Sequence, residues 1–326
     1  MRHRDLGKTG FQVSKVGFGG WAIGGNTFGD SYGATDDAES LAALNRAYEL
    51  GCNYFDTADV YGHGHSEALL GQALQGWRRD EVFISTTVGQ DFSACKQSQS
   101  SSSPSEAVKP NFSTRYIHQA VEASLRRLGL ETIDLYQLHT PPLALIQHAE
   151  VFETLQTLQQ QGKIRFYGIV VHDPQEGIQA IQRGKVAAVQ AVYNLFDTRI
   201  DKMLLPTCQE TQTALIAREP LARGFLSGAM SIERSFEPGD NRFVWPKPLV
   251  QRRVLAANQF KEVIPAHYHS LGQLALAFSS AHPAVSTVLV GCKTRKQVEE
   301  NFAVASLPRL SDAEMTAIQE IQARLY

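Results

Sequence analysis

The sequence predicts an α/β protein, a (β/α)8 TIM barrel with an N-terminal β-hairpin and an extra C-terminal helix. Strand-like and helical segments alternate from Val13 to Ala305, and eight of them read as strands. Alternation of this kind builds right-handed βαβ units and a parallel sheet. The length of 326 residues suits one closed barrel, so we expect a single domain over residues 1–326.

The first segments favour a barrel over an open sheet. Leu6–Gly10 reads as a turn between two short strands, and Val13–Phe18 reads as the first buried strand. An open doubly wound sheet needs a glycine-rich turn that opens a helix after its first strand. The glycines after this strand have a similar spacing, but Gly24–Thr27 continues as a loop. The sequence therefore argues against a dinucleotide-binding turn of that kind.

The later elements follow the same alternation. Helical segments carry apolar residues three and four positions apart, and strand segments are rich in β-branched and aromatic residues. Further strands are expected at Asn53–Thr57, Glu81–Thr86, Ile133–Leu138, Lys163–Val171, Ala187–Tyr193, Ala214–Ala217 and Ser286–Val290. Helices are expected to begin near Asp36, Ser66 and Thr114, to span Ile146–Gln161, Pro174–Gln182, Lys202–Gln212, Gln251–Ile264, Ser270–Ala281 and Thr294–Ala305, and to end with one capped by Ser311.

Two segments without periodicity read as long surface loops, Gln90–Phe112 and Leu221–Pro248. The first holds six serines within Gln97–Ser105. Because such a stretch cannot bury apolar surface, we expect it to be mobile when no ligand is bound.

Composition excludes several classes of function. The formal net charge of −2 argues against a nucleic-acid or membrane surface as the main partner. No run of 18 apolar residues and no basic-then-apolar leader is present, which favours a cytoplasmic protein. The four cysteines are scattered, and His63 and His65 have no third ligand at a suitable spacing, so no metal site is expected. We expect a monomer or weak homo-oligomer.

Polar residues gather where the predicted strands end, which is the face where barrel enzymes carry their sites. Asp56 ends one strand, and Tyr61 follows in the next loop. Thr87 and His139 follow the ends of two others. A tyrosine beside a carboxylate can act as a proton donor only if its pKa is lowered from about 10.

The joint pattern resembles the aldo-keto reductase family over essentially the whole chain. The matching blocks are Gly51–Gly62 with Ser66 and Glu67, Ser124–Leu128, Ile133–His139, Val189–Leu195, Gly224–Gly228, and Val290–Gly291 with Gln297, Glu300 and Asn301. The resemblance implies a barrel that binds NADP(H) and reduces a small-molecule carbonyl or oxidises an alcohol. In that scheme Tyr61 would donate the proton, His139 would polarise the carbonyl, and Asp56 would belong to the supporting ion pair.

The same resemblance implies a cofactor site. At the nicotinamide end Tyr193 would stack on the ring, Gln190 would hold the carboxamide, and Gly20 and Trp21 would line the wall. The residues implied along the pyrophosphate and around the adenosine 2′-phosphate are Leu221, Gly224, Leu226, Ser227, Gly291, Lys293, Thr294, Gln297, Glu300 and Asn301.

Two departures from the family pattern fall at the nicotinamide end. The family's lysine after Ser-Thr is replaced by Thr87, which carries no charge and cannot lower the pKa of Tyr61. A cation about 4 Å away would be worth roughly 4 kcal/mol at an effective dielectric constant of about 20. After Gly168, where the family often places Ser and Asn, the chain has Val170, Val171 and His172. His172 could replace those polar groups only if the loop shifts.

These departures leave three hypotheses. The first is an NADPH-dependent reductase that is slow or specialised. The second is a catalytically quiet NADP(H)-binding sensor or regulatory subunit. The third is a biosynthetic enzyme that uses Tyr61 and His139 for a different reaction.

Overall fold

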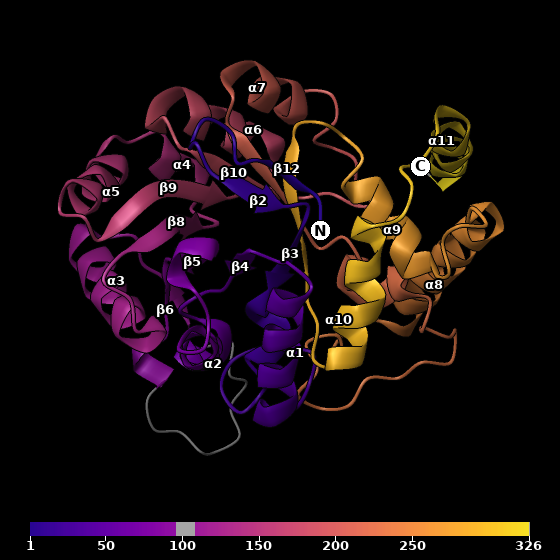
Figure 1. Ribbon diagram of the computed structural model, residues 1–326, viewed down its shortest axis with the longest axis horizontal. Helices are drawn as coiled ribbons and strands as arrows, with labels where there is room; N and C mark the ends of the chain where they lie inside the picture. The colour runs from indigo at the N-terminus through magenta and orange to yellow at the C-terminus, as the bar shows by residue number, and fades with distance from the viewer. Residues whose placement is uncertain (96–107, 326) are drawn as a thin grey trace.

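The computed structural model describes residues 1–95 and 108–325. Eight parallel strands close into a barrel in the order β10-β11-β12-β3-β4-β5-β8-β9 (Figure 1). They are β3 Val16–Gly19, β4 Tyr54–Asp56, β5 Phe83–Val88, β8 Ile133–His139, β9 Ile164–Val170, β10 Ala188–Val192, β11 Ala214–Arg218 and β12 Val285–Val290. The predicted barrel is confirmed, and the serine-rich segment Gln97–Ser105 lies outside the described residues.

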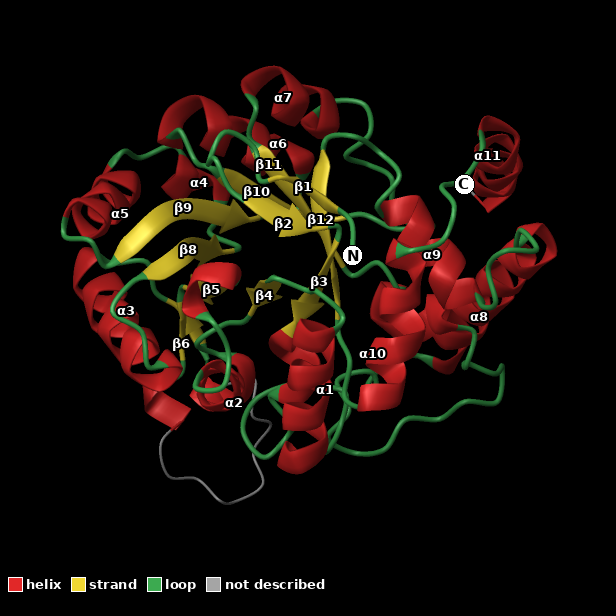
Figure 2. Cartoon of the chain, viewed as in Figure 1, coloured by secondary structure: helices red, strands yellow, loops and turns green. Residues whose placement is uncertain are grey.

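Helices surround the strands (Figure 2). They are α1 Asp37–Glu49, α2 His65–Leu74, α3 Thr114–Leu128, α4 Leu143–Ile146, α5 Glu150–Gln160, α6 Pro174–Gln179, α7 Leu204–Thr211, α8 Lys247–Phe260, α9 Leu271–Ser279, α10 Arg295–Phe302 and α11 Asp312–Leu325. Several begin at the residues the sequence indicates, because their caps are local. Asp36 accepts a hydrogen bond from the backbone of Glu39, and Ser113 does the same for Tyr116. None of the helices in this described part of the chain has the length and apolar run needed to cross a bilayer.

Alternating side chains of the strands fill the inside of the barrel. Tyr54, Phe83, Leu135, Ile216 and Leu289 form one buried cluster there. The residues between them on each strand face outward and pack against the helices in a larger cluster. This period of two decides which side chains at the strand ends reach the barrel mouth.

The N-terminal hairpin closes the other end of the barrel. Strands β1 (His3–Asp5) and β2 (Gln12–Ser14) pair antiparallel, and Figure 2 shows them beside the barrel strands. Leu6 and Val13 are fully buried and belong to the same cluster as the inward residues of the barrel. The hairpin therefore completes the interior core as a floor.

Several predicted boundaries are wrong. The predicted strand Val13–Phe18 is divided between β2, which belongs to the N-terminal hairpin, and β3 of the barrel. The helix predicted over Ile146–Gln161 begins at Glu150, after the separate short helix α4. Strand β5 ends at Val88 rather than Thr86, so Thr87 lies inside the strand. The segment predicted as one loop after Gln90 contains a small hairpin of β6 (Gln90–Asp91) and β7 (Lys109–Pro110). The second long loop contains a turn of 3-10 helix at Ala222–Ser227, and α8 begins four residues before the predicted helix. Long-range packing fixes these ends, and local pattern does not.

Candidate functional site

The barrel mouth holds a cavity of about 860 Å³. Asp56, Tyr61 and His139 line one part of it, and Lys293, Gln297 and Asn301 line another. Residues from opposite halves of the chain therefore share one continuous space. A ligand with polar groups at both ends fits such a space better than a small compact one does.

Asp56 lies at the bottom of this cavity under two amide groups. Its Oδ2 accepts hydrogen bonds from Gln137 Nε2 and Gln190 Nε2, each at 3.2 Å. Gln137 also donates to Ser85 Oγ at 2.8 Å. Burial raises the pKa of Asp56 to about 7, and the hydrogen bonds and Arg218 oppose that shift. The side-chain amides of Gln137 and Gln190 therefore bind Asp56, where the family resemblance implied an ion pair with a lysine.

Tyr61 is held at the rim by a tight turn. Gly62, next to it, has φ +59°, and a Cβ on that glycine would lie 2.2 Å from the carbonyl oxygen of Gly24. Only glycine allows this approach of the two loops. Desolvation and then the charge of Asp56 raise the pKa of the Tyr61 phenol. The phenol is therefore protonated at neutral pH and can donate.

His139 faces Tyr61, with the two ring centres 6.0 Å apart. Its Nδ1 lies 3.1 Å from the hydroxyl oxygen of Thr87, which is 1% exposed. Burial lowers the pKa of His139 to about 4, so the imidazole is neutral at pH 7. If Thr87 donates to Nδ1, the proton of the ring resides on Nε2 and can be offered to a substrate oxygen. Thr87 therefore orients His139 from behind.

Most of the predicted cofactor residues line the cavity. They are Gly20, Trp21, His172, Gln190, Leu221, Gly224, Ser227, Gly291, Lys293, Gln297, Glu300 and Asn301. The amide nitrogen of Gln190 is committed to Asp56, which leaves its carbonyl oxygen to meet a ligand.

Three predicted cofactor residues are not brought to the cavity. Tyr193 packs in the outer core with its ring 5.4 Å from Phe278, because Gln190 points inward and a residue three positions later points outward. Leu226 is fully buried in the same core. Thr294 caps α10 by accepting from the backbone of Gln297 at 3.3 Å.

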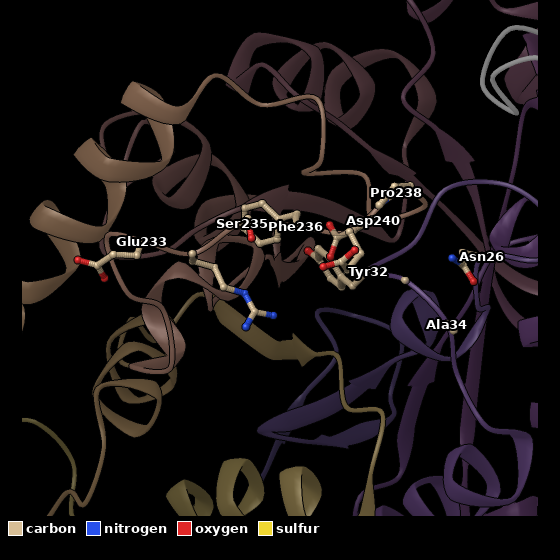
Figure 3. Close-up of a pocket in the computed structure, with 11 residues that line it drawn as sticks. Asn26, Tyr32, Ala34, Glu233, Ser235, Phe236, Pro238 and Asp240 are labelled. Atoms are coloured by element: carbon tan, nitrogen blue, oxygen red, sulfur yellow. The ribbon is translucent and has the colours of Figure 1, made fainter.

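Lys293 fastens a loop over the cavity. Its ammonium donates to the carbonyl oxygens of Tyr32, Gly33 and Ala34 at 2.7, 3.3 and 3.1 Å. The backbone of Tyr32 also pairs with the backbone of Asp240, on the opposite loop, in an isolated antiparallel β-bridge. Figure 3 shows the two residues next to each other. Residues 26–34 form a strap that is held at two points, by Lys293 and by Asp240.

The sequence missed Gln137 and Arg218. Gln137 sits inside a strand between the inward residues Leu135 and His139, and the period of two could have found it. Arg218 follows the predicted end of its strand by one residue, and it lines the cavity. Its Nη2 lies 3.0 Å from Nδ1 of His172.

A metal site finds no support in the described residues. No group of three or more His, Cys, Asp or Glu side chains among them could hold an ion. His63 stacks on Phe92 with ring centres 4.8 Å apart, and His65 pairs with Asp37 at 2.8 Å.

Comparisons with known proteins agree on one family. The model of the aldo/keto reductase family matches residues 15–323. The NADH-specific methylglyoxal reductase of Escherichia coli is 31% identical, over 98% of this chain and 98% of its own length. An aldo-keto reductase of Schizosaccharomyces pombe named for NADP(+) is 30% identical, over 89% of this chain and 84% of its own. The solved structure of a glycerol dehydrogenase from Gluconobacter oxydans has a TM-score of 0.83 at 29% identity, covering 99% of this chain and 95% of that one.

Proposed function

Because the chain belongs to the aldo/keto reductase family, we propose that it is an NADPH-dependent oxidoreductase that interconverts a small carbonyl compound and its alcohol, with Tyr61 as the proton donor. The observation that carries this proposal is the continuous cavity with a phenol and an imidazole at one part and a cation with amides at another. A long ligand with a reactive ring and a phosphorylated end matches that distribution.

The residues present fit a nicotinamide cofactor. Gln297 and Asn301 offer amide donors for a phosphate, and Lys293 adds a positive charge whose ammonium would exchange a strap carbonyl oxygen for the phosphate. Gly291 lines the same cavity without a side chain. The carbonyl oxygen of Gln190 could accept from a carboxamide. When bound, a reduced nicotinamide supplies the hydride. The relatives include one named for NADH and one named for NADP(+), and Lys293 favours the phosphorylated form.

The side chains at the mouth supply the proton. Tyr61 would break its O–H bond and protonate the substrate oxygen, while neutral His139 would donate a second hydrogen bond to the same oxygen. Asp56 would stay below the reacting atoms, held by Gln137 and Gln190. Thr87 would hold the imidazole of His139 in the orientation that points Nε2 at the substrate oxygen.

The test combines binding and turnover. Quenching of protein fluorescence should give tighter binding of NADPH than NADH, and a panel of aldehydes and 2-oxoaldehydes should oxidise NADPH. Tyr61→Phe should lower turnover by about 10²-fold or more without loosening the cofactor. Turnover that survives Tyr61→Phe would refute the proposed proton donor.

A second candidate is a quiet cofactor-binding regulator. The neutral Thr87 at the mouth end of β5 favours it, because no charge there stabilises the phenolate that remains after proton transfer. Tight NADPH binding with no oxidation of the cofactor by any carbonyl would select this function over the first.

A further inference from the structure

The barrel mouth contains a cation that the family pattern did not suggest. Arg218 is the last residue of β11, and Ala214 and Ile216 before it both point into the barrel. The period of two therefore turns Arg218 inward as well, at the level of the mouth. It lines the same cavity as Tyr61, Asp56 and His139.

Neighbouring groups hold the guanidinium in place. Arg218 Nη1 donates to Glu219 Oε1 at 2.7 Å, and Nη2 lies 3.0 Å from His172 Nδ1. Its side chain is only 16% exposed. The backbone carbonyl of Glu219 accepts from Asn194 Nδ2 at 2.9 Å, which fixes the turn after the strand. The buried Nε of Arg218 has no hydrogen-bond partner among the described residues.

The other cations that line the cavity are also bound to protein groups, and none of them stands at the inward-facing end of a barrel strand as Arg218 does. Lys293 is bound to three carbonyl oxygens of the strap. Arg242 pairs with Asp240 at 2.6 Å. Arg223 shares Glu219 with Arg218, at 3.1 Å. Strand β5 offers only the neutral Thr87 at its mouth end.

The charge of Arg218 reaches the proton-transfer groups. Burial and then the charge of Asp56 raise the pKa of Tyr61; the positive charge of Arg218 opposes that rise, and its ion-pair partner Glu219 adds to it. The same guanidinium opposes the rise that burial causes in the pKa of Asp56 and adds to the fall that burial causes in the pKa of His139. The direction is the one that a proton donor needs, because a nearby positive charge stabilises a phenolate.

We infer that Arg218 is the positioning cation of the proton-transfer site, acting through Tyr61 from β11 in place of a charged residue on β5. The inference rests on the proposed function. In carbonyl reduction, a bound reduced nicotinamide would supply the hydride for the new C–H bond and be oxidised, and the Tyr61 O–H bond would break as the substrate O–H bond forms. The electron pair left on the phenolate is stabilised by the guanidinium until water returns the proton.

The test separates charge from structure. Arg218→Gln should lower kcat for carbonyl reduction by about 10- to 100-fold, a part of what a positioned acid supplies. It should also move the ascending limb of the pH profile for alcohol oxidation, where the Tyr61 phenolate acts as the base, up by about one pH unit or more. Arg218→Lys should recover most of both properties, because it keeps the charge. Arg252→Gln, an exposed arginine on α8, is the matched control and should change neither.

A charge moved to another strand provides the second arm. In the Arg218→Gln background, Thr87→Lys places a cation on β5 and should return the pH profile toward that of the native protein, while kcat should recover only in part because the change also removes the hydrogen bond from Thr87 to His139. Profiles that coincide for native protein and Arg218→Gln would overturn the inference. So would a loss of NADPH affinity with an unmoved profile, which would make Arg218 a cofactor ligand. Native protein that turns over no carbonyl would instead refute the proposed function.

Discussion

At the scale of single residues, Thr87 carries no charge but orients His139. Its hydroxyl lies 3.1 Å from Nδ1 of His139 in a buried setting. Thr87→Val keeps the shape and removes the hydrogen bond, so His139 loses its orientation. We expect kcat to fall roughly 3- to 10-fold, which corresponds to the usual net worth of one hydrogen bond. Steady-state kinetics checks this, with Thr87→Ser as the control that should retain most of the activity.

Asp56 should make the free energy of unfolding depend on pH. Its pKa is raised by burial to about 7, so its contribution is most favourable below its unfolded pKa of about 4 and is lost as pH rises toward 7. Compared with Asp56→Asn, the native protein should lose up to about 4 kcal/mol between pH 4 and pH 8. Urea unfolding of both proteins over this range measures the difference. A constant difference would contradict the expected protonation of Asp56.

The comparison with Asp56→Asn is needed because His139 works in the opposite direction. Its pKa is lowered by burial to about 4, so its contribution is present above its unfolded pKa of about 6.5 and is lost as pH falls. In the native protein alone the two effects partly cancel. The difference between the two proteins removes the contribution of His139.

At the scale of elements, a buried ion pair joins α2 to α3. Glu67 is fully buried, and Arg127 Nη2 lies 2.6 Å from it. Arg127→Leu would leave the carboxylate without its counter-charge and should cost about 3–5 kcal/mol of unfolding free energy. Denaturant unfolding measures this. The exposed neighbour, in the variant Arg126→Leu, should change stability by no more than about 0.5 kcal/mol. Equal effects of the two substitutions would show that the ion pair is unimportant.

At the scale of the whole molecule, Lys293 ties the turn between β12 and α10 to the strap. Lys293→Ala removes the bonds to Tyr32, Gly33 and Ala34 and also a cation near the cavity. We expect faster release of NADPH and a smaller preference for NADPH over NADH. Stopped-flow fluorescence gives both quantities, and Lys296→Ala, on the exposed side of α10, is the control. An unchanged release rate and preference would remove Lys293 from both roles.

The barrel could be predicted because its signals are local and repeated. Strand–helix alternation and caps such as Asp36 do not depend on distant contacts. The site could be predicted only in part. Asp56 and His139 lie at strand ends, Tyr61 lies in the loop after β4, and all three reach the cavity. Tyr193 does not, because it lies three residues after the inward-facing Gln190, and an odd number of residues turns a side chain toward the outer core.

The contacts that the sequence could not reveal join residues far apart in the chain. Gln137 reaches Asp56 across 81 positions, and Lys293 reaches Tyr32 across 261. No periodicity encodes such pairs. Arg218 was missed for a simpler reason, since its strand extends one residue further than the predicted end. Because β11 is one residue longer than predicted, Arg218 lies at the barrel mouth and not in the following loop.

The hairpin that closes one end of the barrel has a consequence for how ligands enter and leave. Because Leu6 and Val13 close the far end, two reactants must enter through the same opening at the barrel mouth. Whichever lies deeper under the strap has to arrive first and depart last. The fold therefore favours an ordered sequence of binding and release. In such a sequence, slow release of the outer product also slows the exchange of the ligand that lies deeper.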